Sequence, residues 1–151
     1  MYEDRIERAV SNYKNGYNCT QAVVEAFADL FTDNKATALA LAASFGGGIG
    51  KMRLTCGAAC GAFMLAGLAT CAADPTNMSL KAENTKSVQT IARKFKEENG
   101  SMTCGELLGL VKPADPSVKL PPKRPCTKMI ETAARLFAEY LETKDREPRS
   151  C

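Results

Sequence analysis

An uncharged run of eighteen residues, from position 54 to position 71, constrains the fold of this chain more than any other feature. A soluble helix normally has one polar face, so a helix that is apolar on every side is either buried or spans a membrane. The run is rich in Gly, Ala, Thr and Cys, and it is at or below the roughly 18 to 20 strongly apolar residues that a span requires. We therefore expect residues 55–71 to form the buried central helix of a globular fold.

The start of this expected helix carries the first indication of chemistry. Thr55 is a suitable N-cap, which places Cys56 on the first turn. Unpaired amides and the positive end of the helix dipole favour a negatively charged sulfur there. Gly57 and Gly61 lie four residues apart and allow a neighbouring backbone to come near. The preceding segment FGGGIG, residues 45–50, predicts a close turn between two helices of small residues.

The rest of the chain also has the periodicity of helices. Apolar residues recur at i, i+3, i+4 and i+7 within residues 6–13, 23–30, 88–95 and 130–141, and residues 36–44 are rich in Ala and Leu. Alternation typical of β-strands is hard to find. The sequence thus predicts one all-α domain over residues 1–151, with five to seven helices around a Gly/Ala/Cys-rich central helix. We expect a Pro-rich irregular loop at 112–125 and a frayed tail at 143–151.

Two residue counts narrow the function. The chain has seven cysteines and no histidine, which excludes His-based acid/base catalysis, Cys/His nucleophile pairs and mixed Cys/His zinc sites. The N-terminus has neither a basic region nor an apolar core, so no secretory signal is visible. We therefore expect a cytoplasmic protein whose thiols are mostly reduced. The net charge of +3 is too small to indicate a nucleic-acid partner.

Four cysteines fall at the predicted starts of four helices. Asn18 is a good N-cap, and T-x-x-E from Thr103 to Glu106 fits a capping box. Pro125 marks the start of the last helix, because proline is favoured at a first helical position. These three helix starts and the start of the central helix carry one cysteine each, namely Cys19, Cys56, Cys104 and Cys126.

If the four helix starts converge, they form a pocket of thiolates surrounded by unpaired amides. Such a pocket suits a dianionic iron–sulfur cluster or a zinc ion held by four thiolates. Successive cysteines of this set are 37, 48 and 22 residues apart, and none of them belongs to a C-x-x-C motif. Any site would therefore be assembled from distant parts of the chain. The alternative is that each cysteine is a small buried hydrophobic residue in an alanine-rich core.

Three further cysteines raise a separate question. Cys60 lies one turn after Cys56 on the same helical face, where it could approach the same ligand or act as a resolving thiol. Cys71 is too far along the helix for a disulfide with Cys60, and we expect it to pack in the core. We expect Cys151 to be an incidental surface thiol.

Five segments together resemble a known protein family. They are YNCTQA at 17–22, FGGGIG at 45–50, CGAACG at 56–61, CGELLG at 104–109, and the lone Cys126. Their order is similar to that of the bacterial and archaeal C_GCAxxG_C_C family, to which redox activity is ascribed. The resemblance implies that the four family cysteines are Cys19, Cys56, Cys104 and Cys126, and that they hold an iron–sulfur or similar prosthetic group.

The resemblance also has limits. A related domain is joined to haem-binding segments in split-Soret cytochromes, but this chain has no haem-attachment motif, so a haem function does not carry over. Cys60 stands where the family motif does not require a cysteine, which leaves room for a dithiol mechanism.

These observations predict a redox protein that binds an iron–sulfur cluster and serves in electron transfer or redox sensing. No acid/base pair, substrate site or nucleotide motif is readable, so substrate turnover is not expected. We expect a redox partner protein, no membrane and no nucleic acid, and a homodimer is compatible with the glycine-rich helix surfaces. The alternatives are a thiol–disulfide oxidoreductase using Cys56 with Cys60 or Cys126, a structural four-cysteine zinc protein, and a helical partner-binding module without a metal.

Overall fold

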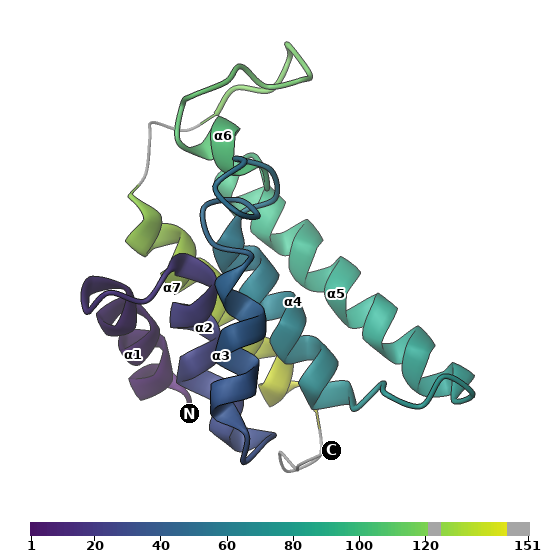
Figure 1. The fold of residues 1–151 in the computed structure, drawn as a ribbon. Helices are drawn as coiled ribbons and strands as arrows, with labels where there is room; N and C mark the ends of the chain where they lie inside the picture. The colour runs from purple at the N-terminus through teal and green to yellow at the C-terminus, as the bar shows by residue number, and fades with distance from the viewer. Residues whose placement is uncertain (121–124, 145–151) are drawn as a thin grey trace.

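The computed structural model describes residues 1–120 and 125–144, and this part of the chain is helical with no named strand (Figure 1). The all-α prediction is thereby confirmed. Of the predicted tail at 143–151, only positions 143 and 144 are among the described residues, and Cys151 lies outside them. The α-helices are α1 (Glu3–Lys14), α2 (Cys19–Phe27), α3 (Lys35–Ala43), α4 (Gly57–Thr70), α5 (Met78–Asn99), α6 (Cys104–Leu107) and α7 (Cys126–Glu142), and a 3₁₀ turn, η1 (Ala28–Leu30), follows α2.

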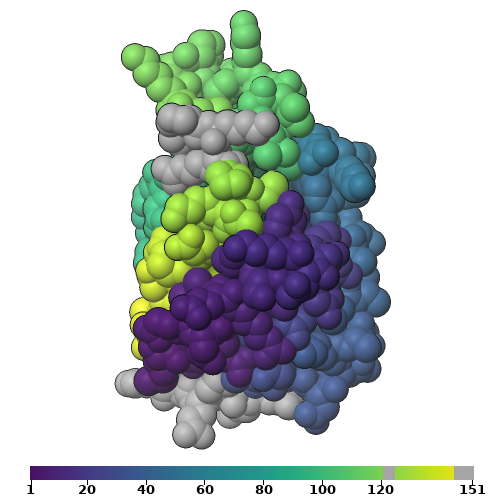
Figure 2. All heavy atoms as spheres, turned by 90° about the vertical axis from the view of Figure 1, so that its left-hand side faces the viewer, coloured from purple at the N-terminus to yellow at the C-terminus, as the bar shows by residue number. Residues whose placement is uncertain are grey.

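Helix α4 is the buried centre, as its lack of a polar face predicts. It packs against α2, α5 and α7, and α1 covers the outer side of α2 and α7 (Figures 1 and 2). Ala58, Ala59, Ala62, Leu65 and Ala66 are almost wholly inaccessible to solvent. No helix in the described ranges is both long and apolar enough to cross a bilayer.

The predicted start of the central helix is one residue too early. Cys56 is the N-cap of α4, whereas Thr55 is extended and forms an antiparallel bridge with Thr103. The amide of Cys56 donates a hydrogen bond to the carbonyl of Met102 at 2.8 Å. Pairing with a distant segment therefore delays the helix, which a local capping pattern cannot reveal. At the other end, Cys71 is the C-cap, half-buried and left-handed with φ 53°.

Small residues set the distance between α2 and α4, as predicted. A Cβ added to Gly61 would lie 2.9 Å from Cβ of Val23 and 3.0 Å from the carbonyl of Thr20. Such distances are too short for nonbonded carbon and oxygen atoms, so the two backbones can meet only at glycine. Beneath this contact the aromatic rings of Phe27 and Phe137 pack edge to face at 5.1 Å.

The glycine-rich segment forms the predicted close turn between α3 and α4. Its residues 47–51 all have positive φ, between 56° and 74°. Two of them, Ile49 and Lys51, are not glycine and adopt a conformation that L-residues usually avoid. The loop after α6 is irregular through position 120, as its prolines predict.

Candidate functional site

Three of the four cysteine-bearing helix starts lie where the sequence places them. Asn18 caps α2 with a full capping box, because its side chain accepts from the amide of Gln21 and its own amide donates to Gln21. Pro125 is the N-cap of α7. Cys19, Cys104 and Cys126 are consequently the first residues of α2, α6 and α7.

The predicted capping box at α6 is wrong, although the helix start is right. The side chain of Thr103 makes no cap hydrogen bond, and its amide donates to the hydroxyl of Ser101 instead of to Glu106. Glu106 instead accepts hydrogen bonds from the hydroxyl of Ser101 and from the amide of Ala114. The amide of Cys104 donates to the carbonyl of Leu54 at 2.6 Å. Helix α6 is thus anchored to the segment before α4 rather than to its own cap.

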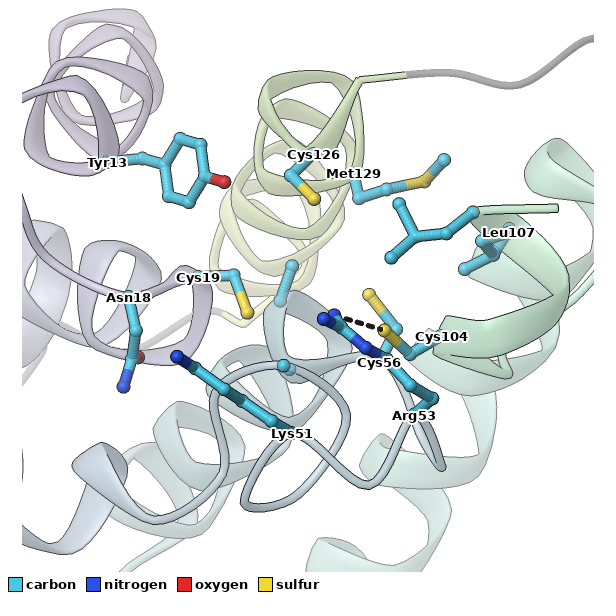
Figure 3. A pocket seen from close by; sticks show the side chains of 14 residues that line it. Tyr13, Asn18, Cys19, Lys51, Arg53, Cys56, Cys104, Leu107, Cys126 and Met129 are labelled. Carbon is cyan, nitrogen blue, oxygen red and sulfur yellow. Dashed lines mark hydrogen bonds between the residues drawn. The ribbon is translucent and has the colours of Figure 1, made fainter. Parts of the chain in front are cut away.

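These four chain segments meet around one cavity of about 200 Å³ (Figure 3). Among the described residues, no histidine and no carboxylate lines this cavity. Leu107 and Met129 close it with apolar side chains, whereas Tyr13 and Asn18 bring polar groups. The cysteines that line it are Cys19, Cys56, Cys104 and Cys126.

Gly57 makes the approach of Cys19 possible. A Cβ at position 57 would lie 2.4 Å from Sγ of Cys19 and 2.7 Å from the hydroxyl oxygen of Thr20. That hydroxyl donates to the carbonyl of Gly57 at 2.8 Å, which ties the start of α2 to the start of α4. A sulfur from one helix therefore rests on the backbone of the other, because Gly57 has no side chain.

Two cations at the cavity were not singled out as site residues from the sequence. Lys51 and Arg53 line the cavity, and Nη1 of Arg53 lies 3.9 Å from Sγ of Cys104, within the range of a sulfur hydrogen bond (Figure 3). The available signal was that these are the only charges between positions 45 and 71. Their direction depends on the left-handed turn, in which both have positive φ, 59° and 61°. No local sequence pattern predicts that turn for lysine and arginine.

A family model described as "Putative redox-active protein (C_GCAxxG_C_C)" matches residues 17–140, which include all four cavity cysteines. The chain belongs to this family. The resemblance of its motifs is thereby confirmed. No curated protein and no solved structure matches the chain. Two residues of the family motif have a geometric role here. Cys56 is the N-cap of α4, and Gly57 leaves the space that the sulfur of Cys19 occupies.

The thiol at the centre of the family motif is not predisposed to ionise in the metal-free protein. Burial raises the pKa of Cys56 to about 12, although the amides of Ala59 and Ala58 favour its charged form. Burial likewise raises the pKa of Cys104, and the nearby Arg53 only partly offsets this. The amide hydrogen bonds expected from the sequence exist at Cys56, but desolvation outweighs their effect on its pKa.

Cys60 belongs to the core beside the cavity and is not among the residues that line it. Burial raises the pKa of its thiol to about 11, and the neighbouring Cys19 adds to the shift. Across residues 1–120 and 125–144, no three Cys, Asp or Glu side chains gather closely enough to surround a single metal ion. The cavity cysteines are instead spaced around its wall (Figure 3).

Proposed function

We propose that this family member carries an iron–sulfur cluster on Cys19, Cys56, Cys104 and Cys126, for electron transfer or redox sensing. The observation that carries the proposal is the single cavity lined by four cysteines from four separate helix starts. A bound cluster would supply one-electron exchange without proton transfer or bond cleavage in a substrate. The chain supplies the thiolates, the low-dielectric surroundings and the compensating charges.

The surroundings suit an anionic centre. Backbone amides of Ala58 and Ala59 are directed at the Cys56 sulfur, and Arg53 approaches Cys104. Hydrogen bonds and positive charge at cluster sulfurs stabilise the added electron of the reduced state. Leu107 and Met129 line the cavity with buried apolar side chains, which would limit the contact of a bound cluster with water on that side. The four cysteines are the metal donors expected in a chain that has no histidine.

The cavity favours a polynuclear centre over one zinc ion. Zinc requires all four sulfurs at about 2.3 Å from one point. The cavity of about 200 Å³ that the four cysteines line has room for several metal and sulfide atoms. The thiol–disulfide alternative is weakened by the raised pKa values of Cys56 and Cys60, because the thiolate is the attacking species and little of it forms at neutral pH.

Anaerobic purification with iron and sulfide analysis and an absorption spectrum tests this proposal. We expect a brown protein with visible sulfur-to-iron bands, and loss of these bands in the Cys56→Ser and Cys126→Ser variants. Cys60→Ser is the matched control, since it changes a buried cysteine on the same helix outside the cavity, and it should retain the bands. A wild-type protein that remains colourless after anaerobic reconstitution with iron and sulfide contradicts the proposal.

A further inference from the structure

The end of the molecule that holds Cys104 has an exposed apolar surface. Among the described residues, eight large hydrophobic side chains are exposed, and four of them lie in just two short segments. These four, which we call the α6 patch, are Met52 and Leu54 before α4 and Leu110 and Val111 after α6, each 49% to 63% exposed. Such a concentration marks an interaction site more often than scattered single residues do.

The two segments of the patch are joined to each other at Gly105. Its amide donates to the carbonyl of Arg53 at 3.0 Å, and its carbonyl accepts from the amide of Leu110 at 2.8 Å. A Cβ at Gly105 would lie 3.0 Å from Cγ2 of Val111 and 3.4 Å from Cβ of Arg53. The turn before α4 and the start of α6 thus lie together at one end of the molecule (Figure 1), and Cys104 is the first residue of α6.

Positive charge accompanies the patch. Lys51, Arg53 and Lys112 lie in or beside its two segments, and neither segment contains an acid. None of these three forms an ion pair with another described residue. By contrast, Arg5 pairs with Asp29, and Arg8 and Lys35 both pair with Glu25. Two carboxylates lie near these segments in the sequence: Glu106 accepts hydrogen bonds from Ser101 and from the amide of Ala114, and Asp115 accepts hydrogen bonds from Ser117. The patch therefore presents apolar side chains beside three cations that form no ion pair with another described residue.

We propose that the α6 patch is the docking surface for an acidic electron-transfer protein, which exchanges one electron with the centre behind Cys104. This inference rests on the proposed function and names its partner by chemistry. An exposed apolar patch can serve as the core of an interface, and the cations beside it steer an anionic partner. Weak redox encounters use small interfaces, often below about 1,200 Å², so such a partner does not require a large apolar surface. In the exchange, the reduced partner would lose one electron and a centre held by the cavity thiolates would gain it, with no bond formed or broken.

Binding to a plant-type [2Fe–2S] ferredoxin, a small acidic redox protein, tests the docking surface directly. We expect association that weakens steeply as ionic strength rises, and no association with basic cytochrome c at equal concentration. Leu110→Ser and Lys112→Glu should each raise Kd about fivefold or more. The matched controls are Leu41→Ser on α3, where the side chain is 63% exposed, and Lys86→Glu on exposed α5 surface; both should leave Kd within about twofold.

Iron and sulfide content, measured in every variant, separates this inference from the proposed function. Unchanged iron with weakened ferredoxin binding in Leu110→Ser supports docking at the patch. If the chain never takes up iron but still binds ferredoxin through the patch, the cluster proposal is wrong and the docking proposal is supported. Salt-independent binding, equal effects of patch and control variants, no ferredoxin binding at all, or stronger binding to vesicles of anionic phospholipid would each overturn the docking proposal.

Discussion

At the scale of single residues, Gly57 carries the most specific geometric demand of the site. The missing Cβ would lie 2.4 Å from Sγ of Cys19 and 2.9 Å from the backbone oxygen of Phe45, which cannot move away easily. We expect Gly57→Ala to destabilise the fold by about 1 to 3 kcal/mol through overpacking and to abolish iron binding. Chemical denaturation and iron analysis measure both effects.

Gly67 provides the control on the same helix. A Cβ there meets nothing closer than Oδ1 of Asn84 at 4.0 Å. Gly67→Ala should therefore leave iron binding intact and stabilise the protein by up to about 1 kcal/mol through helix propensity. If Gly57→Ala binds iron as the Gly67→Ala variant does, then Cys19 does not sit against α4 in the working protein.

The buried thiols should also differ from the half-buried ones in reactivity. In metal-free protein at neutral pH, we expect iodoacetamide to modify Cys19 and Cys126 about a hundredfold faster than Cys56 and Cys60. The latter pair are 6% and 8% exposed, and burial raises their pKa values to about 12 and 11. Mass spectrometry of the peptides measures the four rates, and denaturant should make them similar. First modification at Cys56 would instead revive the thiol–disulfide mechanism.

At the scale of helices, one buried carboxylate joins α1, α2 and α3. Glu25 of α2 is 6% exposed and accepts hydrogen bonds from Arg8 and Asn12 of α1 and from Lys35 of α3, the last at 2.7 Å. Burial alone raises the pKa of Glu25, but these donors outweigh it and lower the pKa to about 2. Removal of this charge should therefore loosen three helices at once.

The stability that Glu25 contributes should depend on pH in a defined window. Because its folded pKa is depressed, the contribution is complete above the unfolded value of about 4.5 and is lost as pH falls toward 2. We expect Glu25→Gln to lower the free energy of unfolding by about 2 to 3 kcal/mol at pH 7 and by little near pH 2. The exposed pair Arg93–Glu97 supplies the control Glu97→Gln, which should cost less than about 1 kcal/mol at either pH. Equal losses in the two variants at pH 7 would refute this role.

The helices themselves were predictable because their signals are local. Asn18 and Pro125 mark helix starts through contacts within a few residues, and those starts are where the sequence places them. Thr103 failed as a capping box because Glu106 found Ser101 and Ala114 instead. Thr55 failed as a cap because it pairs with residue 103, almost fifty positions away. Propensity rules do not include such distant partners, so they missed both details.

At the scale of the molecule, the sequence indicated four separated cysteines but could not bring them together. Their meeting depends on the glycine contact between α2 and α4 and on the backbone pairing that holds α6 against residues 53–55. Lys51 and Arg53 reach the cavity only through the left-handed turn before them. The arrangement of the four cysteines around one cavity is therefore a property of the assembled fold. The family motif identifies these cysteines but does not specify the distances between them.

Because the four cysteines belong to four helix starts, a group bound by all of them should stabilise the molecule as a whole. Ligand that binds only the folded state adds about 2.7 kcal/mol at a hundredfold excess over Kd, which corresponds to a rise in Tm of about 5 to 10 °C for a chain of this size. We expect that rise on anaerobic loading of wild type and of Cys60→Ser, and its loss in Cys104→Ser. Hydrogen exchange should slow most at α6, since this short helix has few contacts with the other helices. Iron binding that leaves both Tm and exchange at α6 unchanged would mean that the metal is held elsewhere.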